Sequence, residues 1–242
     1  MRPNANAATY VGMSPDELVP IDEGVYCLEH NLRMPGGTLF PTRMTLIRLG
    51  NGDVWMHSAV PISDAIAAKI DAIGPVRHLV APNLYHHLFV IPALERWPQA
   101  QLWIAPGLEK KRPDLAHGLR LDASTSMAAW GNEITVNPIA GAPKLNECVF
   151  FHRPSGSLIV SDLFFNFDRA RGFRQALLFR IMDVSGGLRQ SRVWGMITAD
   201  RKAAAESCEP IFAWPIRRII AGHGMIRENA TTADVRAAIT RF

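Results

Sequence analysis

Short apolar segments alternate with segments of helical periodicity along this 242-residue chain, and this alternation constrains the fold more than any other feature. Residues 78–81 are apolar, residues 88–97 have a helical pattern, and residues 101–105 are apolar again. Such an order of strand, helix and strand is typical of sheets covered by helices, and it argues against all-α and all-β folds. The sequence therefore predicts an α/β protein.

Turn and capping residues place the other expected elements. Asn51 and Gly52 separate two apolar segments and predict a β-hairpin. Ser63 can cap a helix that Gly74 and Pro75 end. Further strands are expected at 24–28, 147–151, 158–160 and 217–221, and helices over much of 168–214 and at 231–242. We expect one domain over 1–242, with residues 1–20 as an extended N-terminal arm.

Composition narrows the class of protein. The net charge is +4, but the basic residues are scattered, whereas nucleic-acid binding requires a cluster of them. No apolar stretch approaches the roughly 18 residues that a membrane span needs, and no secretory leader is visible at the start. The three cysteines are far apart and form no Cys-x-x-Cys pair. We expect a cytoplasmic protein that acts on a small molecule, without nucleic-acid or membrane partners; homo-oligomers are compatible with the sequence.

Four polar patches mark a candidate site. Each stands where an apolar run gives way to a polar or glycine turn, and each supplies an imidazole or a carboxylate, which zinc-like divalent metals prefer. The patches are Asn83-Leu84-Tyr85-His86-His87, Asn146-Glu147, Ser161-Asp162 and Gly222-His223-Gly224. Their composition predicts a metal site but does not name a substrate.

In their order, these patches resemble the metallo-β-lactamase-fold superfamily, and in particular a divergent branch of it. Family members carry a motif His-x-His-x-Asp-His between a strand and a helix. Here Pro82 and Leu84 take the places of the first two histidines, His86 takes that of the aspartate, and His87 keeps the last histidine. Residues 157–163 resemble the strand that ends in the family's bridging aspartate, and residues 219–224 resemble the strand that ends in Gly-His-Gly. The resemblance runs from about residue 21 to the C-terminus and implies a four-layered αββα sandwich.

The resemblance also implies a ligand set. One divalent ion, zinc in the first place and iron in the second, would be held by His86, His87, Asp162 and His223, because Pro82 and Leu84 remove only half of a two-metal site. Neighbouring residues of a strand point to opposite faces, so His86 and His87 can converge only in a turn. The alternatives are that one of these two histidines is structural and that Asp162 caps the next segment.

Other residues are candidates for catalysis or substrate binding. Asp162 or Glu147 would orient the attacking water; Glu147 is equally interpreted as a ligand, as a residue that orients an imidazole, or as a carboxylate at a strand edge. His57 would line the pocket or be buried, and Asn83 and Tyr85 would bind a substrate oxygen or satisfy their own turn. Lys110, in the charged segment 107–114, would hold an anionic group or belong to a solvated helix start.

Two functions are compatible with these residues. The first is a mononuclear metal-dependent hydrolase that acts on an ester, lactone, amide or phosphoester. The alternative is a catalytically degenerate member of the superfamily that binds no metal and serves as a binding or scaffold protein. The two missing histidines keep this alternative open, because function is decided by the site and not by the fold.

Overall fold

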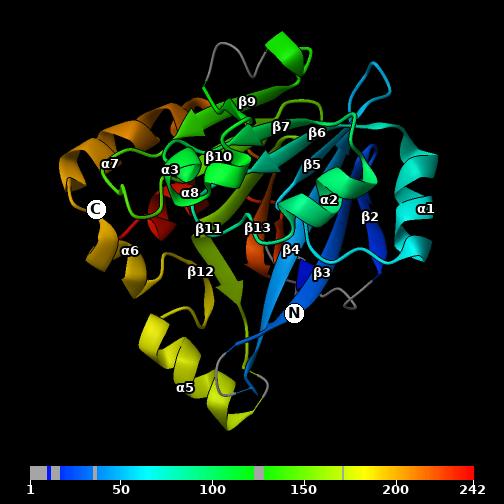
Figure 1. Ribbon diagram of the computed structural model, residues 1–242. Coiled ribbons are helices and arrows are strands. Elements are labelled where there is room, and N and C mark those ends of the chain that lie inside the picture. The colour runs from blue at the N-terminus through cyan, green and yellow to red at the C-terminus, as the bar shows by residue number, and fades with distance from the viewer. Residues whose placement is uncertain (1–9, 12–16, 35–36, 123–127, 171) are drawn as a thin grey trace, which may run out of the picture.

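The computed structural model describes residues 10–11, 17–34, 37–122, 128–170 and 172–242. In this part of the chain, two seven-stranded sheets lie face to face and helices cover their outer sides (Figure 1). The expected α/β fold with the layers α, β, β and α is confirmed.

The first sheet is built from the N-terminal half of the chain, in the order β2-β3-β4-β5-β6-β7-β8. Its strands β2 to β5 are antiparallel, whereas β5, β6, β7 and β8 are parallel neighbours, which is why helices connect them. The strands are β2 (Leu18–Asp22), β3 (Val25–Arg33), β4 (Leu39–Arg48), β5 (Val54–His57), β6 (Val76–Ala81), β7 (Gln101–Ile104) and β8 (Leu119–Arg120).

The second sheet has the order β1-β14-β13-β11-β10-β9, with β12 paired to β11. Strands β11 and β13 are parallel, and their register shifts between Val160 and Phe165. Residues 161–164 of β11 therefore leave the regular ladder. The strands are β1 (Tyr10–Val11), β9 (Ile134–Pro138), β10 (Cys148–His152), β11 (Ser157–Phe167), β12 (Gly187–Arg189), β13 (Arg218–Gly224) and β14 (Ile226–Glu228).

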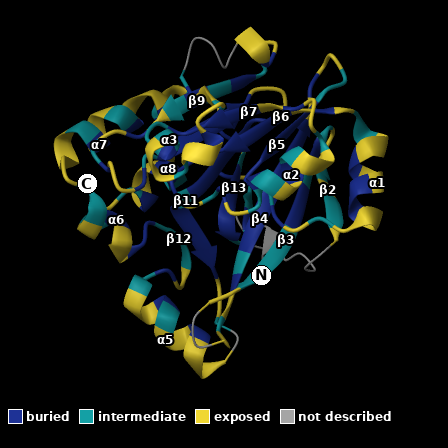
Figure 2. Ribbon diagram, in the orientation of Figure 1, coloured by how far each residue is buried: buried dark blue, intermediate teal, exposed yellow. Residues whose placement is uncertain are grey.

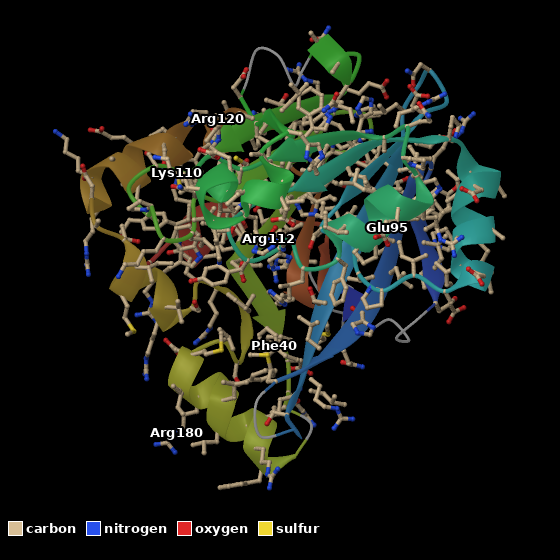
Figure 3. All side chains as sticks on the ribbon, in the orientation of Figure 1. Phe40, Glu95, Lys110, Arg112, Arg120 and Arg180 are labelled. Atoms are coloured by element: carbon tan, nitrogen blue, oxygen red, sulfur yellow. The ribbon has the colours of Figure 1, made fainter. Side chains whose placement is uncertain are left out.

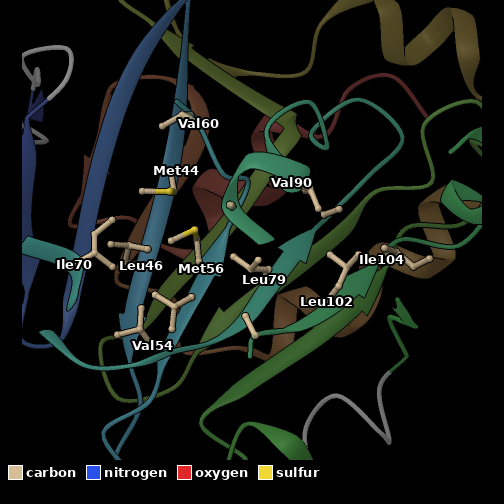
Figure 4. Close-up of a cluster of buried hydrophobic side chains, with 14 of the residues drawn as sticks. Met44, Leu46, Val54, Met56, Val60, Ile70, Leu79, Val90, Leu102 and Ile104 are labelled. Carbon is tan, nitrogen blue, oxygen red and sulfur yellow. The ribbon is translucent and has the colours of Figure 1, made fainter. Parts of the chain in front are cut away.

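Three helices cover the first sheet: α1 (Asp64–Ile73), α2 (Val90–Arg96) and the short α3 (Leu108–Lys111). Ser63 caps α1, since its Oγ accepts a hydrogen bond from the amide of Ile66. Buried side chains of α1 and α2 pack against Met44, Leu46, Met56 and Leu79 of the sheet (Figure 4). Alternate residues of each strand therefore face this helical layer, as period-two patterning requires.

The outer face of the second sheet is covered by α6 (Arg192–Ile197), α7 (Arg201–Cys208), the 3₁₀ helix η3 (Glu209–Ala213) and α8 (Thr232–Ala238). Helix α5 (Phe173–Met182) contacts α6 and packs on Phe40, Phe165 and Phe167 at the far end of the molecule (Figure 1). Between the sheets lies a layer of large apolar side chains that includes Trp55, Trp103, Trp130 and Phe150. Figure 2 shows this central region as almost wholly buried.

Several expected elements have different bounds in the structure. The strand expected at 24–28 begins at Val25 and is part of the longer β3, and the expected closing helix at 231–242 is limited to α8. The 168–214 region is mostly helical, as expected, but also contains β12. Of the expected arm, residues 1–9 and 12–16 lie outside the described residues, whereas Leu18 to Pro20 are part of β2, paired with β3.

The fold brings the ends of four strands to one edge of the sandwich. Strands β5 and β6 are parallel neighbours in one sheet, and β11 and β13 are parallel neighbours in the other. Ser58 follows β5, and the segment 82–87 follows β6. Asp162 lies where β11 leaves the register of β13, and His223 lies near the C-terminal end of β13. Among the described helices, none is long and apolar enough to cross a membrane.

Candidate metal centre

Three side chains from distant parts of the chain meet at this edge. The Nε2 atoms of His86 and His223 lie 3.1 Å apart. Asp162 Oδ1 lies 3.2 Å from His223 Nε2, and Asp162 Oδ2 lies 3.4 Å from His86 Nε2. All three ligand atoms fall within 4.8 Å of one another, and this is the group of potential metal ligands found among the described residues.

The second nitrogen of each imidazole is held by a protein oxygen. His223 Nδ1 lies 2.8 Å from the carbonyl oxygen of Pro41, and His86 Nδ1 lies 2.5 Å from Ser58 Oγ. Because a carbonyl only accepts, His223 Nδ1 must carry the proton, and in the neutral ring the lone pair is on Nε2. Such partners fix the tautomer and the orientation of histidine ligands in metal sites.

Asn83 joins the histidine segment to the aspartate. Its Oδ1 accepts hydrogen bonds from the amides of Tyr85 (2.8 Å) and His86 (2.7 Å), which makes the tight turn after β6. Its Nδ2 donates to Asp162 Oδ2 at 2.8 Å. Asn83 is completely buried, and its hydrogen bonds position the turn and Asp162.

Glu147 holds the backbone on both sides of Asp162. Its Oε1 accepts hydrogen bonds from the amides of Ser161 (2.9 Å) and Leu163 (3.0 Å), and its Oε2 accepts one from the amide of Asp162 (2.9 Å). These amides belong to the stretch in which β11 leaves the register of β13. A buried carboxylate therefore supplies the acceptors that this irregular backbone needs.

A glycine allows β13 to approach the histidine segment. A Cβ atom on Gly222 would lie 3.2 Å from His86 Cε1 and 2.9 Å from the carbonyl oxygen of Ser161. Both contacts are crowded, so a larger residue before His223 would displace the ring of His86. Beside it, the buried Arg43 of β4 donates to the carbonyl oxygen of Ala221 at 2.5 Å and also contacts the carbonyl oxygen of Gly224. These bonds attach the C-terminal part of β13 to the first sheet.

Electrostatics favour a negative charge on Asp162. Burial alone would raise the pKa of this carboxyl, but His86 and His223 outweigh that effect and hold it well below its usual range. Burial likewise works against protonation of His86, yet the neighbouring Asp162 raises the pKa of His86. Burial and the charge of Asp162 raise the pKa of Glu147, although its backbone amide donors act in the opposite direction.

These features fit one divalent cation. Two imidazole nitrogens and a carboxylate face a common point. The hydrogen bond from His223 Nδ1 to the Pro41 carbonyl leaves the lone pair of the neutral ring on Nε2, which faces this point. Without a cation, the His86 and His223 nitrogens can share only one proton at 3.1 Å. A donor set of two histidines and one carboxylate suits zinc or iron.

His87 is not part of this group. Its Nδ1 lies 3.0 Å from Arg112 Nη1, and burial, with the charges of Lys111 and Arg112, lowers its pKa. His86 and His87 thus diverge in the turn: one faces Asp162, while the other faces the segment that follows α3. Lys110 lies within α3, and Arg112 directly follows this helix (Figure 3).

A cavity of about 480 Å³ opens onto the three-residue cluster. His86, Asp162 and His223 contribute to its lining, as do Tyr85, which is half exposed, and His87. Three of the residues predicted to bind substrate, Lys110, Asn83 and His57, are absent from the lining that the described residues form, where Lys111 and Ser58 are found instead. His57 is buried against Trp55 in the layer between the sheets, and burial lowers its pKa to about 3.

Sequence reasoning missed the residues that hold the cluster in place. Ser58 follows the apolar strand β5 and has a positive φ of 57°, which is unusual for a residue with a side chain. Pro41 acts through a backbone carbonyl, and Arg43 is the buried charged residue of β4. No spacing rule identifies the first two; an arginine next to the apolar residues of a strand was the available signal for the third.

The arrangement of the sheets, the helices and the cluster defines a metallo-β-lactamase fold. The structure is similar to that of DIM-1 metallo-β-lactamase exposed to ceftazidime, with a TM-score of 0.64 and 12% identity over 94% of this chain and 98% of that chain. For the metallo-β-lactamase from Pontibacter korlensis, the TM-score is 0.62 and the identity 12%, over 92% and 97% of the two chains. For that from Erythrobacter litoralis, the values are 0.59 and 15%, over 97% and 95%. Identities this low show the fold alone.

The chain belongs to the family described as Domain of unknown function (DUF4336), whose model matches residues 22–172. The matched region contains His86, Glu147 and Asp162 and ends before His223. No curated protein sequence matches the chain.

Proposed function

We propose that this protein is a mononuclear metal-dependent hydrolase, with His86, Asp162 and His223 as the ligands of one divalent ion, zinc in the first place. The observation that carries the proposal is the convergence of the three ligand atoms within 4.8 Å on the wall of a cavity. The fold of the similar structures, which are named as metallo-β-lactamases, supports hydrolysis as the reaction class.

A bound zinc ion with three protein ligands supplies a water whose pKa is lowered to about 7 and polarises the oxygen of the substrate. The protein's own part is orientation. Ser58 and Pro41 fix the two imidazole rings, and Asn83 fixes one oxygen of Asp162. Glu147 holds the backbone that carries Asp162, and because backbone amides occupy both of its oxygens we assign it to positioning and not to proton transfer.

The missing histidines of the family motif fit a mononuclear site. Pro82 and Leu84 are buried, and Leu84 packs in the core on the outer side of the first sheet. Neither side chain can bind a metal, so the half-site that the superfamily resemblance would place there has no donors. The second half, which the three-residue cluster occupies, is sufficient for one ion.

The test is elemental analysis of the full chain, purified without added metal and again after incubation with zinc and removal of the excess. We expect about one equivalent in the wild type, none in the Asp162→Asn, His223→Ala double variant, and about one in the matched control His87→Ala. Hydrolysis of a panel of nitrophenyl esters, a nitrophenyl phosphodiester and a cephalosporin would follow metal content. No metal after reconstitution, or equal content in all three proteins, would overturn the proposal.

A further inference from the structure

The cavity that opens onto the cluster has an apolar wall away from it. This wall is built by side chains from four separate parts of the chain: β3, the segment before α2, α5 and α6. The residues are Leu32, Phe89, Met182, Val193 and Ile197. Val193, an apolar residue of this wall, is 41% exposed. A volume of about 480 Å³ is in the range of small-molecule sites.

The described residues of this wall carry no cationic side chain. Lys111 is the one lysine or arginine among the described residues of the lining. Its Nζ donates to the carbonyl oxygen of Leu84 at 2.5 Å and lies 4.4 Å from the centre of the Tyr85 ring. Arg112, outside the lining, is paired with Asp114 at 2.5 Å and contacts His87. An anionic group lying along the wall would have no charged partner among the described wall residues, and burying such a group without a partner is unfavourable.

We propose that the substrate of this site is an uncharged carboxylic ester, open-chain or lactone, whose acyl part is an apolar chain lying along the wall formed by Leu32, Val193 and Ile197. This inference rests on the proposed hydrolase function and adds the substrate class. In the reaction, water adds to the acyl carbon and the bond from this carbon to the alcohol oxygen breaks. One proton of the water passes to the alcohol, and the acid that forms releases the other as it ionises.

An apolar wall should give a graded dependence on chain length. Each methylene group that moves from water to this wall increases the affinity for the transition state and for the substrate alike. We therefore expect kcat/KM to rise about tenfold for two added methylene groups until the wall is filled. An anionic substrate of the same length should gain nothing from the wall.

The test uses the full chain loaded with zinc and a series of p-nitrophenyl esters below their solubility limits. Butyrate should exceed acetate about tenfold in kcat/KM, and octanoate should exceed butyrate. The hemisuccinate ester has the same four acyl carbons as butyrate and one negative charge, and we expect its kcat/KM to be at least about tenfold below that of butyrate. A flat series, or preference for the hemisuccinate, would overturn the proposal.

A positive charge introduced into the wall separates this effect from general hydrophobicity. Val193→Arg adds a cation that the wall lacks, so the butyrate to hemisuccinate ratio should fall at least tenfold. The control is Leu119→Arg, at a residue that is 42% exposed and absent from the described lining. It should leave the ratio and the series unchanged. Equal effects of both substitutions would contradict a role of the wall.

Titration with 2-octanone, an uncharged carbonyl compound that cannot be hydrolysed, tests the wall without catalysis. We expect it to bind the zinc-free wild type and Leu119→Arg equally, and Val193→Arg at least tenfold more weakly. If zinc fails to bind but the ketone titrations give this pattern, the hydrolase proposal is wrong and the apolar site stands. If zinc binds and only the phosphodiester or the cephalosporin is hydrolysed, the hydrolase proposal stands and the ester inference is wrong.

Discussion

His86 Nε2 and His223 Nε2 lie 3.1 Å apart, although 137 residues separate these histidines in the sequence. The proximity depends on both sheets, because His86 follows β6 of the first and His223 lies on β13 of the second. Two imidazole rings at this distance repel when both are protonated, and neutral rings can share one proton between them. A divalent cation bound by both Nε2 lone pairs, with Asp162 as counter-charge, would remove the repulsion between the two rings.

Removal of one imidazole should change stability only when metal is present. With His223→Ala we expect metal binding to be lost, and with it the stabilisation of the wild type by zinc, which is about 4 kcal/mol when the free ion is at a thousand times its dissociation constant. Calorimetric unfolding of both proteins with zinc and with a chelator measures this difference. Equal destabilisation under both conditions would indicate a packing role, such as the stacking of His223 on Phe165.

The carboxylate beneath the cluster should control metal affinity at a distance. Glu147→Gln replaces one acceptor oxygen by a donor that faces the amides of residues 161–163, so we expect a loss of about 1–3 kcal/mol in the free energy of unfolding. Because Asp162 is then displaced, the affinity for zinc should fall by about 10–100-fold. Competition with a chromogenic chelator measures the affinity. An unchanged affinity in a destabilised variant would show that Glu147 serves the backbone alone.

Part of the site could be predicted because strands impose it. Asp162 and His223 follow apolar runs of strand length, and the ends of the parallel strands β11 and β13 necessarily lie at one edge of a sheet. The turn expected before the helix at 88–97 predicts that His86 lies near Asp162 and His223. The layered fold followed from the same alternation of strands and helices.

The remaining part depends on tertiary contacts that leave no periodic signal. Which of His86 and His87 faces Asp162 is decided by Asn83, whose side chain holds the turn through two backbone amides. The role of Glu147 depends on an irregularity in β11 that no residue pattern shows. The orienting oxygens of Ser58, directly after β5, and of Pro41 in β4 come from segments that neither adjoin the ligands in sequence nor carry a recognisable motif.

A histidine remote from the cluster should make stability depend on pH. Burial lowers the pKa of His152 to about 4, against the weaker opposing influence of Asp22. Between about pH 6.5 and 4, the unfolded chain therefore binds a proton that the folded protein does not, and the free energy of unfolding falls as the pH falls. For His152→Gln, urea titrations over this range should give a slope smaller by up to about 1.4 kcal/mol per pH unit. Equal slopes would show that His152 does not titrate differently on unfolding.

Restoring the missing half-site should not produce a second metal site. Pro82 is buried and its carbonyl oxygen accepts a hydrogen bond from the amide of Cys148 at 2.8 Å, while Leu84 packs in the core and its own amide is bonded to Leu145. The double substitution Pro82→His with Leu84→His therefore buries two imidazoles where the surroundings are apolar. We expect one metal equivalent by elemental analysis, as in the wild type, and a loss of about 1–3 kcal/mol in the free energy of unfolding.

The single substitution Leu84→Met is the control for this half-site, because it keeps an apolar side chain of similar volume and should cost less than about 1.5 kcal/mol. Two equivalents of metal in the double variant, with the stability of the wild type, would show that the dinuclear framework is intact around Pro82 and Leu84. That result would contradict the expectation that this segment has adapted to Pro82 and Leu84, since it would then have kept the geometry of ligands that it no longer has.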